Sequence, residues 1–204
     1  MQKVLVTGFA PFDHEVLNPS YESLKSLPHQ INHFSIIIHE LPTTFNESAQ
    51  QIIDLIQNIQ PDYILMLGQA GGKTSISIER VAINIDDATI PDNHGNLPKD
   101  QPIIVGGPTA YFSTLPIKRL NENLLNHGIP SSISNSAGTF VCNHLMYQVL
   151  HFIETSNLKT RAGFIHVPYI HEQTKEKMNM FSMNLEDITR AITIIIKSLG
   201  EDLL

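Results

Sequence analysis

Short, continuously apolar runs alternate along the chain with segments whose apolar residues recur every three or four positions. The apolar runs predict buried strands at residues 4–8, 34–39, 62–68 and 163–168. The three- and four-residue spacing predicts helices at residues 20–27, 45–59, 116–127, 142–154 and 184–199. Strands without polar alternation are typical of a largely parallel sheet covered on both faces, so the pattern predicts an α/β fold.

The helix predicted after the second strand has a defined start, whereas the middle of the chain is irregular. Thr44 and Glu47 have the spacing of a capping box, and Pro61 ends the helix behind them. Residues 75–86 are rich in β-branched side chains and predict strand structure. Residues 87–110 contain four prolines and three glycines, which predicts a long loop of the kind that is often functional in compact domains.

No internal repeat, low-complexity tract or linker divides the chain, so residues 1–204 are expected to form a single domain. The composition, with 42% hydrophobic and 16% charged residues, is sufficient for a sizeable core. The formal net charge is −7, and Lys and Arg do not form a run. We therefore expect no nucleic-acid partner.

The N-terminal apolar stretch is too short for an export signal and is expected to be the first strand. No segment approaches the ~20 apolar residues of a membrane span, so no membrane association is expected. Together with the single cysteine, these features predict a cytoplasmic location.

Cys142 is the only cysteine, and it follows a turn of small residues at the predicted start of a helix. A lone cysteine has no disulfide partner within the chain, and free cysteines are commonly inert core residues. At a helix N-terminus, however, the positive end of the macrodipole favours the thiolate form. The residues around Cys142 therefore leave two interpretations open, an inert thiol and a nucleophile.

A cysteine nucleophile needs a base, and the chain has ten histidines. His144 is nearest in sequence, but two residues along a helix is a rotation of about 200°, which turns it away from Cys142. His166 lies at the carboxyl end of an apolar strand, where sites gather in open α/β sheets. Its imidazole is equally compatible with a structural role. Four carboxylates are open candidates for the group that orients the base: Glu79, Asp86, Asp87 and Asp92.

Two other kinds of site are disfavoured by the residues present. The segment 71–74 is similar to the end of a phosphate-binding loop, but the upstream glycine is absent at the required spacing. One cysteine excludes a cysteine-rich zinc site, and no His-Glu-x-x-His sequence occurs. We therefore expect neither a nucleotide nor a metal site.

Four segments occur along the chain in an order that is typical of one known family: Thr7–Phe12 with Asn18–Ser20, Gly68–Gly72 with Glu79–Asn84, Ile90–Asn93, and Ala137–His144 with His166–Tyr169. In these segments the chain resembles pyroglutamyl-peptidase I, also called pyrrolidone-carboxylate peptidase, a family of cysteine peptidases. The resemblance implies one α/β domain in three layers, with helices on both faces of a mixed, mainly parallel sheet. It also implies a homotetramer that needs no metal or other cofactor.

The resemblance assigns the catalytic roles that the residues alone left open. It implies that Cys142 is the nucleophile, that His166 is the base and that Glu79 is the third catalytic residue. The implied reaction is hydrolytic removal of an N-terminal pyroglutamyl residue from peptides through a thioester. The implied substrate-binding residues are Phe9, Phe12, Asn18, Gln69, Ile90, Phe140 and Val141, which would supply apolar walls and amide contacts for an uncharged lactam.

The sequence departs from the family pattern at two places. Asp13 and His14 stand where members often have glycines, and Thr89 stands where members usually carry arginine. These departures motivate an alternative hypothesis, a catalytically weakened binder of lactams or modified N-termini on the same fold. A third hypothesis is a different hydrolase or a phosphorylase on a similar sheet. The presence of Cys142, His166 and Glu79 argues against the third hypothesis.

Overall fold

The centre of the molecule is a seven-stranded sheet built from β1 (Gln2–Phe9), β2 (Gln30–Ile31), β3 (Phe34–Leu41), β4 (Tyr63–Gln69), β5 (Ile76–Glu79), β8 (Ser131–Ser134) and β9 (Arg161–Val167). This computed structural model describes residues 1–200 of the chain. The strand order is β2–β3–β1–β4–β9–β5–β8. The strands β3, β1, β4 and β9 are parallel, whereas β5 is antiparallel to β9 and β2 is antiparallel to β3. The expected mixed, mainly parallel sheet is confirmed.

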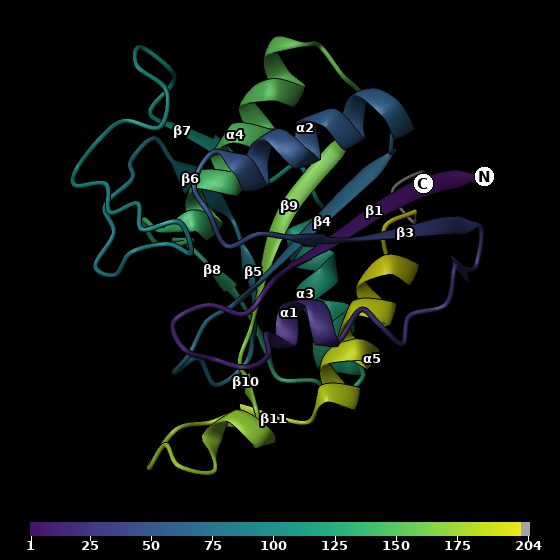
Figure 1. Ribbon diagram of the computed structural model, residues 1–204. Helices are drawn as coiled ribbons and strands as arrows, with labels where there is room; N and C mark the ends of the chain where they lie inside the picture. Colours follow the sequence, from purple (N-terminus) through teal and green to yellow (C-terminus); the bar gives the residue numbers. More distant parts are fainter. Residues whose placement is uncertain (201–204) are drawn as a thin grey trace.

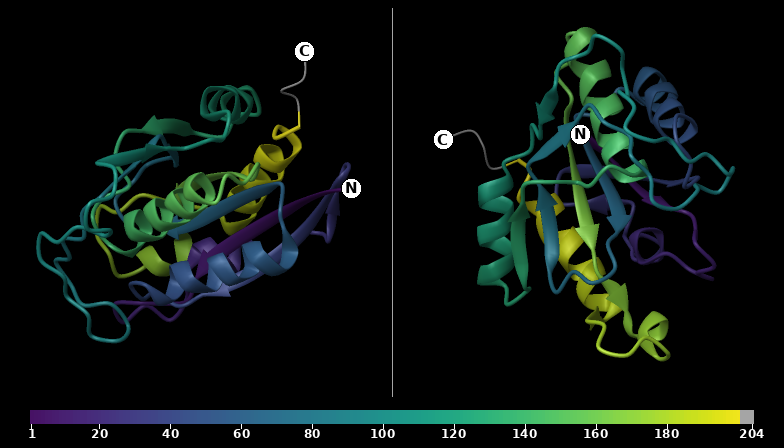
Figure 2. Two further views of the ribbon diagram at one scale, coloured as in Figure 1. Left: turned by 90° about the horizontal axis from the view of Figure 1, so that it is seen from above. Right: turned by 90° about the vertical axis from the view of Figure 1, so that its left-hand side faces the viewer.

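The helices form a layer on each side of this sheet. They are α1 (Pro19–Glu22), α2 (Glu47–Ile59), α3 (Ile117–Asn126), α4 (Val141–Thr155) and α5 (Leu185–Lys197). Helices α2 and α4 pack on one face, and α3 and α5 pack on the other (Figure 1, Figure 2). The expected three-layer α/β architecture is therefore confirmed, with the apolar stripe of each long helix turned toward the sheet.

Side chains alternate between the two faces along each buried strand. On β4, Leu65 and Leu67 enter the core that contains α3 and α5. Ile64 and Met66 enter the opposite core, which contains α2 and α4. All four side chains are fully buried. The parity of a residue in β4 or β9, that is, whether its number is odd or even, thus decides which helices its side chain contacts.

Five short elements complete the described chain: β6 (Val81–Ile83), β7 (Ala110–Phe112), β10 (Tyr169–Ile170), β11 (Ser182–Met183) and the 3-10 helix η1 (His171–Thr174). Between β6 and β7, residues 84–109 form the expected long loop, at the left of Figure 1. An isolated bridge between Asp86 and Gln101 is its only strand-type pairing in the described structure.

The predicted capping box at the start of α2 is wrong. The N-cap is Asn46, which makes no side-chain cap hydrogen bond, and Thr44 Oγ1 instead contacts Glu47 Oε2 at 3.3 Å. Side chains distant in sequence accept the N–H groups before the helix, because Phe45 N donates to Asp92 and Asn46 N donates to His144. Tertiary partners have replaced the local cap.

The predicted helix at residues 20–27 is also shorter than expected. Helix α1 ends at Glu22, and Leu24 and Leu27 follow it as buried side chains of the α3–α5 core. The apolar residues that suggested about two helical turns therefore mark burial rather than continued helix.

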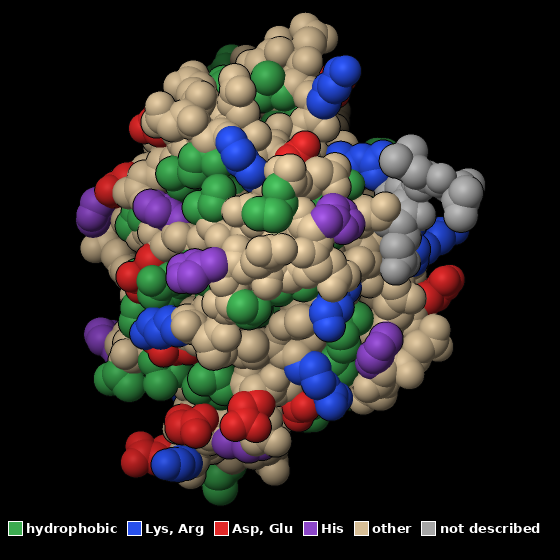
Figure 3. All heavy atoms as spheres, turned by 90° about the vertical axis from the view of Figure 1, so that its right-hand side faces the viewer, with side chains coloured by type: hydrophobic (Ala, Val, Ile, Leu, Met, Phe, Trp, Pro, Cys, Tyr) green, Lys and Arg blue, Asp and Glu red, His purple; other side chains and the backbone are tan. Residues whose placement is uncertain are grey.

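The surface carries a mixture of charges. On the face shown in Figure 3, Lys and Arg side chains are spread among acidic and histidine side chains. Within residues 1–200, no helix has the length and apolar character needed to cross a bilayer. The predicted domain of residues 1–204 also includes residues 201–204, which lie outside the described part of the chain.

Candidate active site

Strand pairing brings Glu79 and His166 to the same edge of the sheet. Gly68 of β4 is in register with His166 of β9, and Ser77 of β5 pairs with His166 from the other side. By parity, His166 shares the sheet face of Phe164, which packs in the core with α4. The face that carries His166 is therefore the face on which Cys142 lies.

The absence of a side chain at residue 68 makes room for the thiol. A Cβ atom added to Gly68 would lie 2.8 Å from Cys142 Sγ and 2.7 Å from the ring of Phe164. Real Cβ atoms do not approach neighbours this closely, and Phe164 is fully buried and has no space to move. Gly68 is thus required for the thiol to occupy this position.

Cys142 lies in the first turn of α4, as expected. Phe140 is the N-cap in an extended conformation, and Gly138 precedes it with a φ of +82°. No described group accepts a hydrogen bond from Cys142 N–H, because this amide precedes the first complete turn of the helix. The thiol therefore lies at the positive end of the helix beside a free donor.

Asn143, the residue after Cys142, holds the start of α4 in place. Asn143 is fully buried; its Oδ1 accepts from Ile83 N at 2.9 Å, and its Nδ2 donates to the Ile83 and Ile85 carbonyls. Asn143 therefore ties the nucleophile's helix to β6. Local spacing could not indicate this role for Asn143, since an asparagine inside a helix has no fixed partner.

His166 is buried and bonded to Glu79. His166 Nδ1 lies 2.8 Å from Glu79 Oε1, and the exposed fractions are 6% for His166 and 0% for Glu79. Burial alone would lower the pKa of His166, but the charge and hydrogen bond of Cys142 and those of Glu79 outweigh it and raise the pKa to about 9. The Nδ1 proton is donated to the carboxylate, which leaves Nε2 to exchange a proton with Cys142.

A small cavity of about 130 Å³ opens beside these residues. It is lined by Phe9, Phe12, Asn18, Thr43, Gln69, Ala137, Phe140, Cys142 and His166. Five of the seven residues that the resemblance implies for substrate binding therefore line this cavity. Thr43 and Ala137 are additional lining residues that the sequence did not indicate.

Ile90 and Val141 are not among the residues that line the cavity. Val141 is fully buried because, one position before Cys142 on α4, its side chain turns into the core beneath the helix. Ile90 lies in the long loop, next to the exposed Thr89. Thr89 is not a lining residue either, so the position at which family members usually carry arginine lies outside the cavity wall.

The polar atoms of Asn18 are already engaged within the protein. Its Oδ1 accepts from Ser20 N and Ser20 Oγ, and its Nδ2 donates to the Ala10 carbonyl at 3.2 Å. Thr43 Oγ1 donates to the same carbonyl at 2.8 Å. Asn18 therefore caps α1 and fixes the loop that carries Phe12, and one of its two Nδ2 N–H groups has no partner among the described residues.

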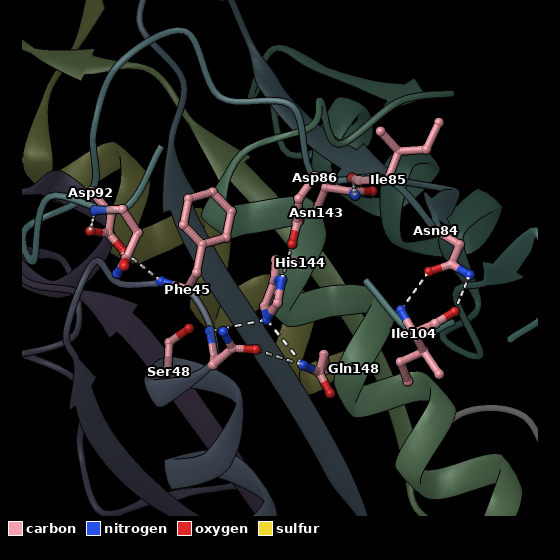
Figure 4. A network of polar contacts seen from close by, with 12 residues as sticks. Phe45, Ser48, Asn84, Ile85, Asp86, Asp92, Ile104, Asn143, His144 and Gln148 are labelled. Carbon is pink, nitrogen blue, oxygen red and sulfur yellow. Dashed lines mark hydrogen bonds and ion pairs between the residues drawn. The ribbon is translucent and has the colours of Figure 1, made fainter. Parts of the chain in front are cut away.

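His144 faces away from the cavity, as predicted, and is the centre of a separate buried network (Figure 4). Its Nδ1 lies 2.7 Å from Asp86 Oδ2, and its Nε2 accepts from Asn46 N and from Gln148. The ring proton is therefore on Nδ1. Asp86 is hydrogen-bonded to His144 rather than to His166, so Asp86 is no longer a candidate for the catalytic carboxylate.

The two other carboxylate candidates also have different positions. Burial raises the pKa of Asp92, but hydrogen bonds from Asn96, Phe45 and His94 outweigh it and hold the pKa below its usual value. Asp87 is exposed, and its backbone pairs with Thr139. Of the four carboxylates, Glu79 alone contacts His166 within residues 1–200.

Larger cavities, of about 230, 240 and 430 Å³, lie elsewhere on the molecule. None is lined by cysteine. The 230 Å³ cavity is lined by His171 and Ser182, whose Nδ1 and Oγ lie 2.7 Å apart, but no carboxylate in the described structure is hydrogen-bonded to His171, so size does not identify the site here. Among the described residues, no group of three or more His, Cys, Asp or Glu side chains is arranged to hold a metal ion.

A buried histidine between a helix-start cysteine and a glutamate, at the edge of an α/β sheet, defines a cysteine hydrolase. The model of the family described as pyroglutamyl peptidase matches residues 2–202. The chain therefore belongs to the pyroglutamyl peptidase family.

Individual relatives agree with this assignment. A pyrrolidone-carboxylate peptidase of Brachyspira hyodysenteriae is 52% identical over 196 residues, which is 96% of this chain and 98% of the relative. The crystal structure of pyroglutamyl peptidase I from Bacillus amyloliquefaciens matches with a TM-score of 0.95 at 45% identity, covering 98% of this chain and 95% of the other. A mutant pyrrolidone carboxyl peptidase from Pyrococcus furiosus matches with a TM-score of 0.95 at 42% identity over the full length of both chains.

Proposed function

We propose that this protein hydrolyses the bond after an N-terminal pyroglutamyl residue of a peptide, with Cys142 as nucleophile, His166 as base and acid, and Glu79 as the group that orients His166. The observation that supports this most directly is the 2.8 Å contact between His166 and Glu79, made beside Cys142 at the start of α4. Family membership supports the same reaction, since the relatives are named for it.

The first half of the reaction begins with transfer of the Cys142 proton to His166. Although burial lowers the pKa of His166, the charges and hydrogen bonds of Cys142 and Glu79 raise this pKa to about 9, so the imidazole is a strong enough base to accept the proton. The Cys142 thiolate attacks the pyroglutamyl carbonyl carbon, a C–S bond forms, and the carbonyl electrons move to oxygen. The free N–H of Cys142 stabilises this oxyanion at the helix start.

In the second half, the peptide C–N bond breaks and His166 transfers its proton to the departing amine. The thioester remains on Cys142, and His166 is now neutral. His166 takes a proton from water, the hydroxide attacks the thioester, and free pyroglutamate leaves. The thiolate and imidazolium are restored, so one water is consumed for each bond cleaved. Glu79 stays ionised and stabilises the imidazolium.

The cavity suits a lactam rather than an amino terminus with a charge. Its lining residues include three phenylalanines and no carboxylate, and Glu79 lies fully buried behind His166. An α-ammonium group would find no anion there, whereas a lactam ring carries no charge to neutralise. A volume of about 130 Å³ is also small beside the roughly 300–1,000 Å³ of pockets for drug-sized ligands, which favours a single small ring.

The location and assembly are proposed from the resemblance and from exposed apolar side chains. We propose a cytoplasmic homotetramer, as the resemblance implies. Exposed apolar side chains such as Val105 and Phe112 are surfaces that contacts between subunits would cover. Light scattering of the purified protein and fractionation of the producing cells test these two proposals separately.

The experiment for the proposed activity is release of a reporter amine from a pyroglutamyl conjugate by the wild-type protein and by Cys142→Ala. We expect turnover by the wild type only, and no release from a prolyl or glutamyl conjugate. Full activity of Cys142→Ala contradicts the cysteine mechanism. Tight binding of the conjugate without turnover by the wild type supports the alternative of a lactam binder.

A further inference from the structure

Gln173 is a buried glutamine, 9% exposed, on η1, and it lines the cavity of about 430 Å³ together with Glu15 and Lys177. Its Nε2 donates to Gln69 Oε1 at 2.7 Å and to Glu15 Oε2 at 3.2 Å. Its Oε1 accepts from Ile170 N at 3.2 Å. Both amide N–H groups and the carbonyl are therefore engaged, and the side chain joins three segments that are distant in sequence.

Glu15 has a second partner, Lys177, whose Nζ pairs with Glu15 Oε1. The Lys177 ammonium also lies 4.1 Å from the centre of the Tyr169 ring. Burial lowers the pKa of Lys177, but Glu15 and Tyr169 outweigh it and raise the pKa above its usual value. We refer to Glu15, Gln69, Gln173 and Lys177 as the rim network. Acidic and basic side chains crowd together at the bottom of Figure 3, where η1 lies.

The rim network is attached to the wall of the active-site cavity, of about 130 Å³, through Phe12. Glu15 N donates to the Phe12 carbonyl at 3.0 Å and closes a turn over Asp13 and His14. Both turn residues have positive φ, +52° and +64°, which is unfavourable for side chains that carry a Cβ. The ring of Phe12 lines the cavity and lies 6.2 Å from the ring of Phe140, measured between centroids.

Hydrogen bonds therefore hold the chain in place both before and after Phe12. Before it, the Ala10 carbonyl accepts from Thr43 and Asn18, and the Pro11 carbonyl accepts from Asn93. After it, the Glu15 carboxylate accepts hydrogen bonds from Gln173 and Lys177, its only side-chain partners within residues 1–200. Without them, the strained turn is free to relax and to carry the Phe12 ring away from Phe140.

We propose that Gln173 is a positioning residue for the lactam cavity: it clamps the Phe12 turn to the end of β4 and so sets the width of the cavity. This proposal rests on the proposed function, because the ring being held is the pyroglutamyl ring. It adds a determinant of substrate affinity that acts through Phe12 and Gln69 and does not touch the reacting atoms.

The rim network is separate from the catalytic residues. Gln69 lines the cavity beside Cys142 and His166, but the only hydrogen bond of its side chain within residues 1–200 is the one with Gln173. No hydrogen bond in the described structure joins Gln173 to Glu79, His166 or Cys142. Loss of the Gln173 contacts is therefore expected to weaken substrate binding while the chemical step is preserved.

The test compares Gln173→Leu and Gln173→Glu with the wild type, and uses the exposed Gln50→Leu as the matched control. We expect KM for a pyroglutamyl reporter to rise by about tenfold in both Gln173 variants, which corresponds to ~1.4 kcal/mol. We expect kcat to stay within about twofold. The rate of Cys142 alkylation by iodoacetamide, which needs no lactam cavity, is expected to be unchanged.

The Gln173→Glu variant provides a rescue that a structural defect does not. At pH 8 its added carboxylate faces the Glu15 carboxylate and the Gln69 carbonyl, and it has no proton to donate. The neighbouring carboxylate raises the pKa of the added group, so lowering the pH to about 5.5 restores a donor. We therefore expect the ratio of variant to wild-type KM to fall as the pH falls, and the ratio for Gln173→Leu to stay constant.

A second measurement keeps this proposal distinct from the proposed function. Protection of Cys142 from alkylation by 2-pyrrolidinone, a free lactam ring, reports on the cavity without turnover. Weaker protection in the Gln173 variants supports the proposal. Unchanged KM and unchanged protection overturn it, as does an alkylation rate that falls in parallel with kcat/KM. Absence of both turnover and protection in the wild type overturns the proposed function instead.

Discussion

Replacement of Glu79 by glutamine changes the charge beside His166 with almost no change in shape. In the wild type, the Glu79 carboxylate accepts the His166 Nδ1 proton at 2.8 Å. A glutamine can present its N–H₂ group to Nδ1 instead, which places the ring proton on Nε2, toward Cys142. That tautomer cannot accept a proton from the thiol. The imidazolium also loses one of the two negative groups that stabilise it.

The size of the effect follows from the pKa of His166. A rise from 6.5 to about 9 corresponds to roughly 3 kcal/mol, at 1.36 kcal/mol per unit, and this stabilisation is shared between Cys142 and Glu79. Removing one opposite charge at this distance typically lowers the pKa by about one unit or more. Loss of the group that fixes the tautomer lowers kcat by up to about 10⁴-fold in comparable triads.

The assay is kcat/KM for a pyroglutamyl reporter between pH 6 and 10.5, measured beside the rate of Cys142 alkylation by iodoacetamide. Turnover by the wild type is expected to fall as the pH rises through about 9, because protonated His166 must supply a proton to the departing amine. Alkylation needs no such proton and is expected to persist above that pH. In Glu79→Gln, the alkaline fall is expected at a pH at least one unit lower, with a large drop in kcat.

Glu122→Gln, at an exposed position on α3, is the matched control and is expected to leave both profiles unchanged. Thermal unfolding establishes that Glu79→Gln is folded at the assay temperature. A Glu79→Gln profile that coincides with the wild type, at a similar kcat, refutes the role given to Glu79.

Three further predictions follow from the packing and backbone geometry. Gly68→Ala is expected to lower kcat/KM by about 100-fold or more, because the added Cβ displaces Cys142 Sγ; a variant with near wild-type kcat/KM contradicts the 2.8 Å approach. His14→Gly is expected to raise the free energy of unfolding by about 1 kcal/mol and Tm by ~2–4 °C, since its φ is +64°; an unchanged or lower Tm contradicts the strain. His144→Phe is expected to lower the free energy of unfolding by about 3 kcal/mol in denaturant titration, because Asp86 is left buried and unpaired; an unaltered midpoint contradicts that pairing.

The main elements could be predicted because their signals are local. Continuous apolar runs identified the central strands, and the apolar stripe of residues 184–199 identified α5, observed at Leu185–Lys197. Predictions were wrong where residues distant in sequence determine the local structure. The start of α2 is capped by Asp92 and His144, which lie 47 and 98 residues from the amides that they accept, so local spacing misidentified Thr44 as the cap.

The same distinction holds for the site. Helix periodicity correctly turned His144 away from Cys142, and the end of an apolar strand indicated His166. Spacing could not choose among four carboxylates, because the choice depends on the pairing of β5 with β9. Nor could it show that Asn18 is hydrogen-bonded within the first loop, that Val141 faces the core, or that Gln173 reaches Gln69. Gln173 and Gln69 lie 104 residues apart, so only tertiary packing brings them together.

The central claim is that Cys142 is the nucleophile, and the presence of a single cysteine allows a direct measurement. The protein is treated with iodoacetamide for increasing times, and the fraction carrying one added group is measured by intact mass beside the residual turnover of a pyroglutamyl reporter. We predict that turnover falls in proportion to the alkylated fraction and reaches zero at one group per chain. Turnover that persists in protein fully alkylated at Cys142 would contradict the account.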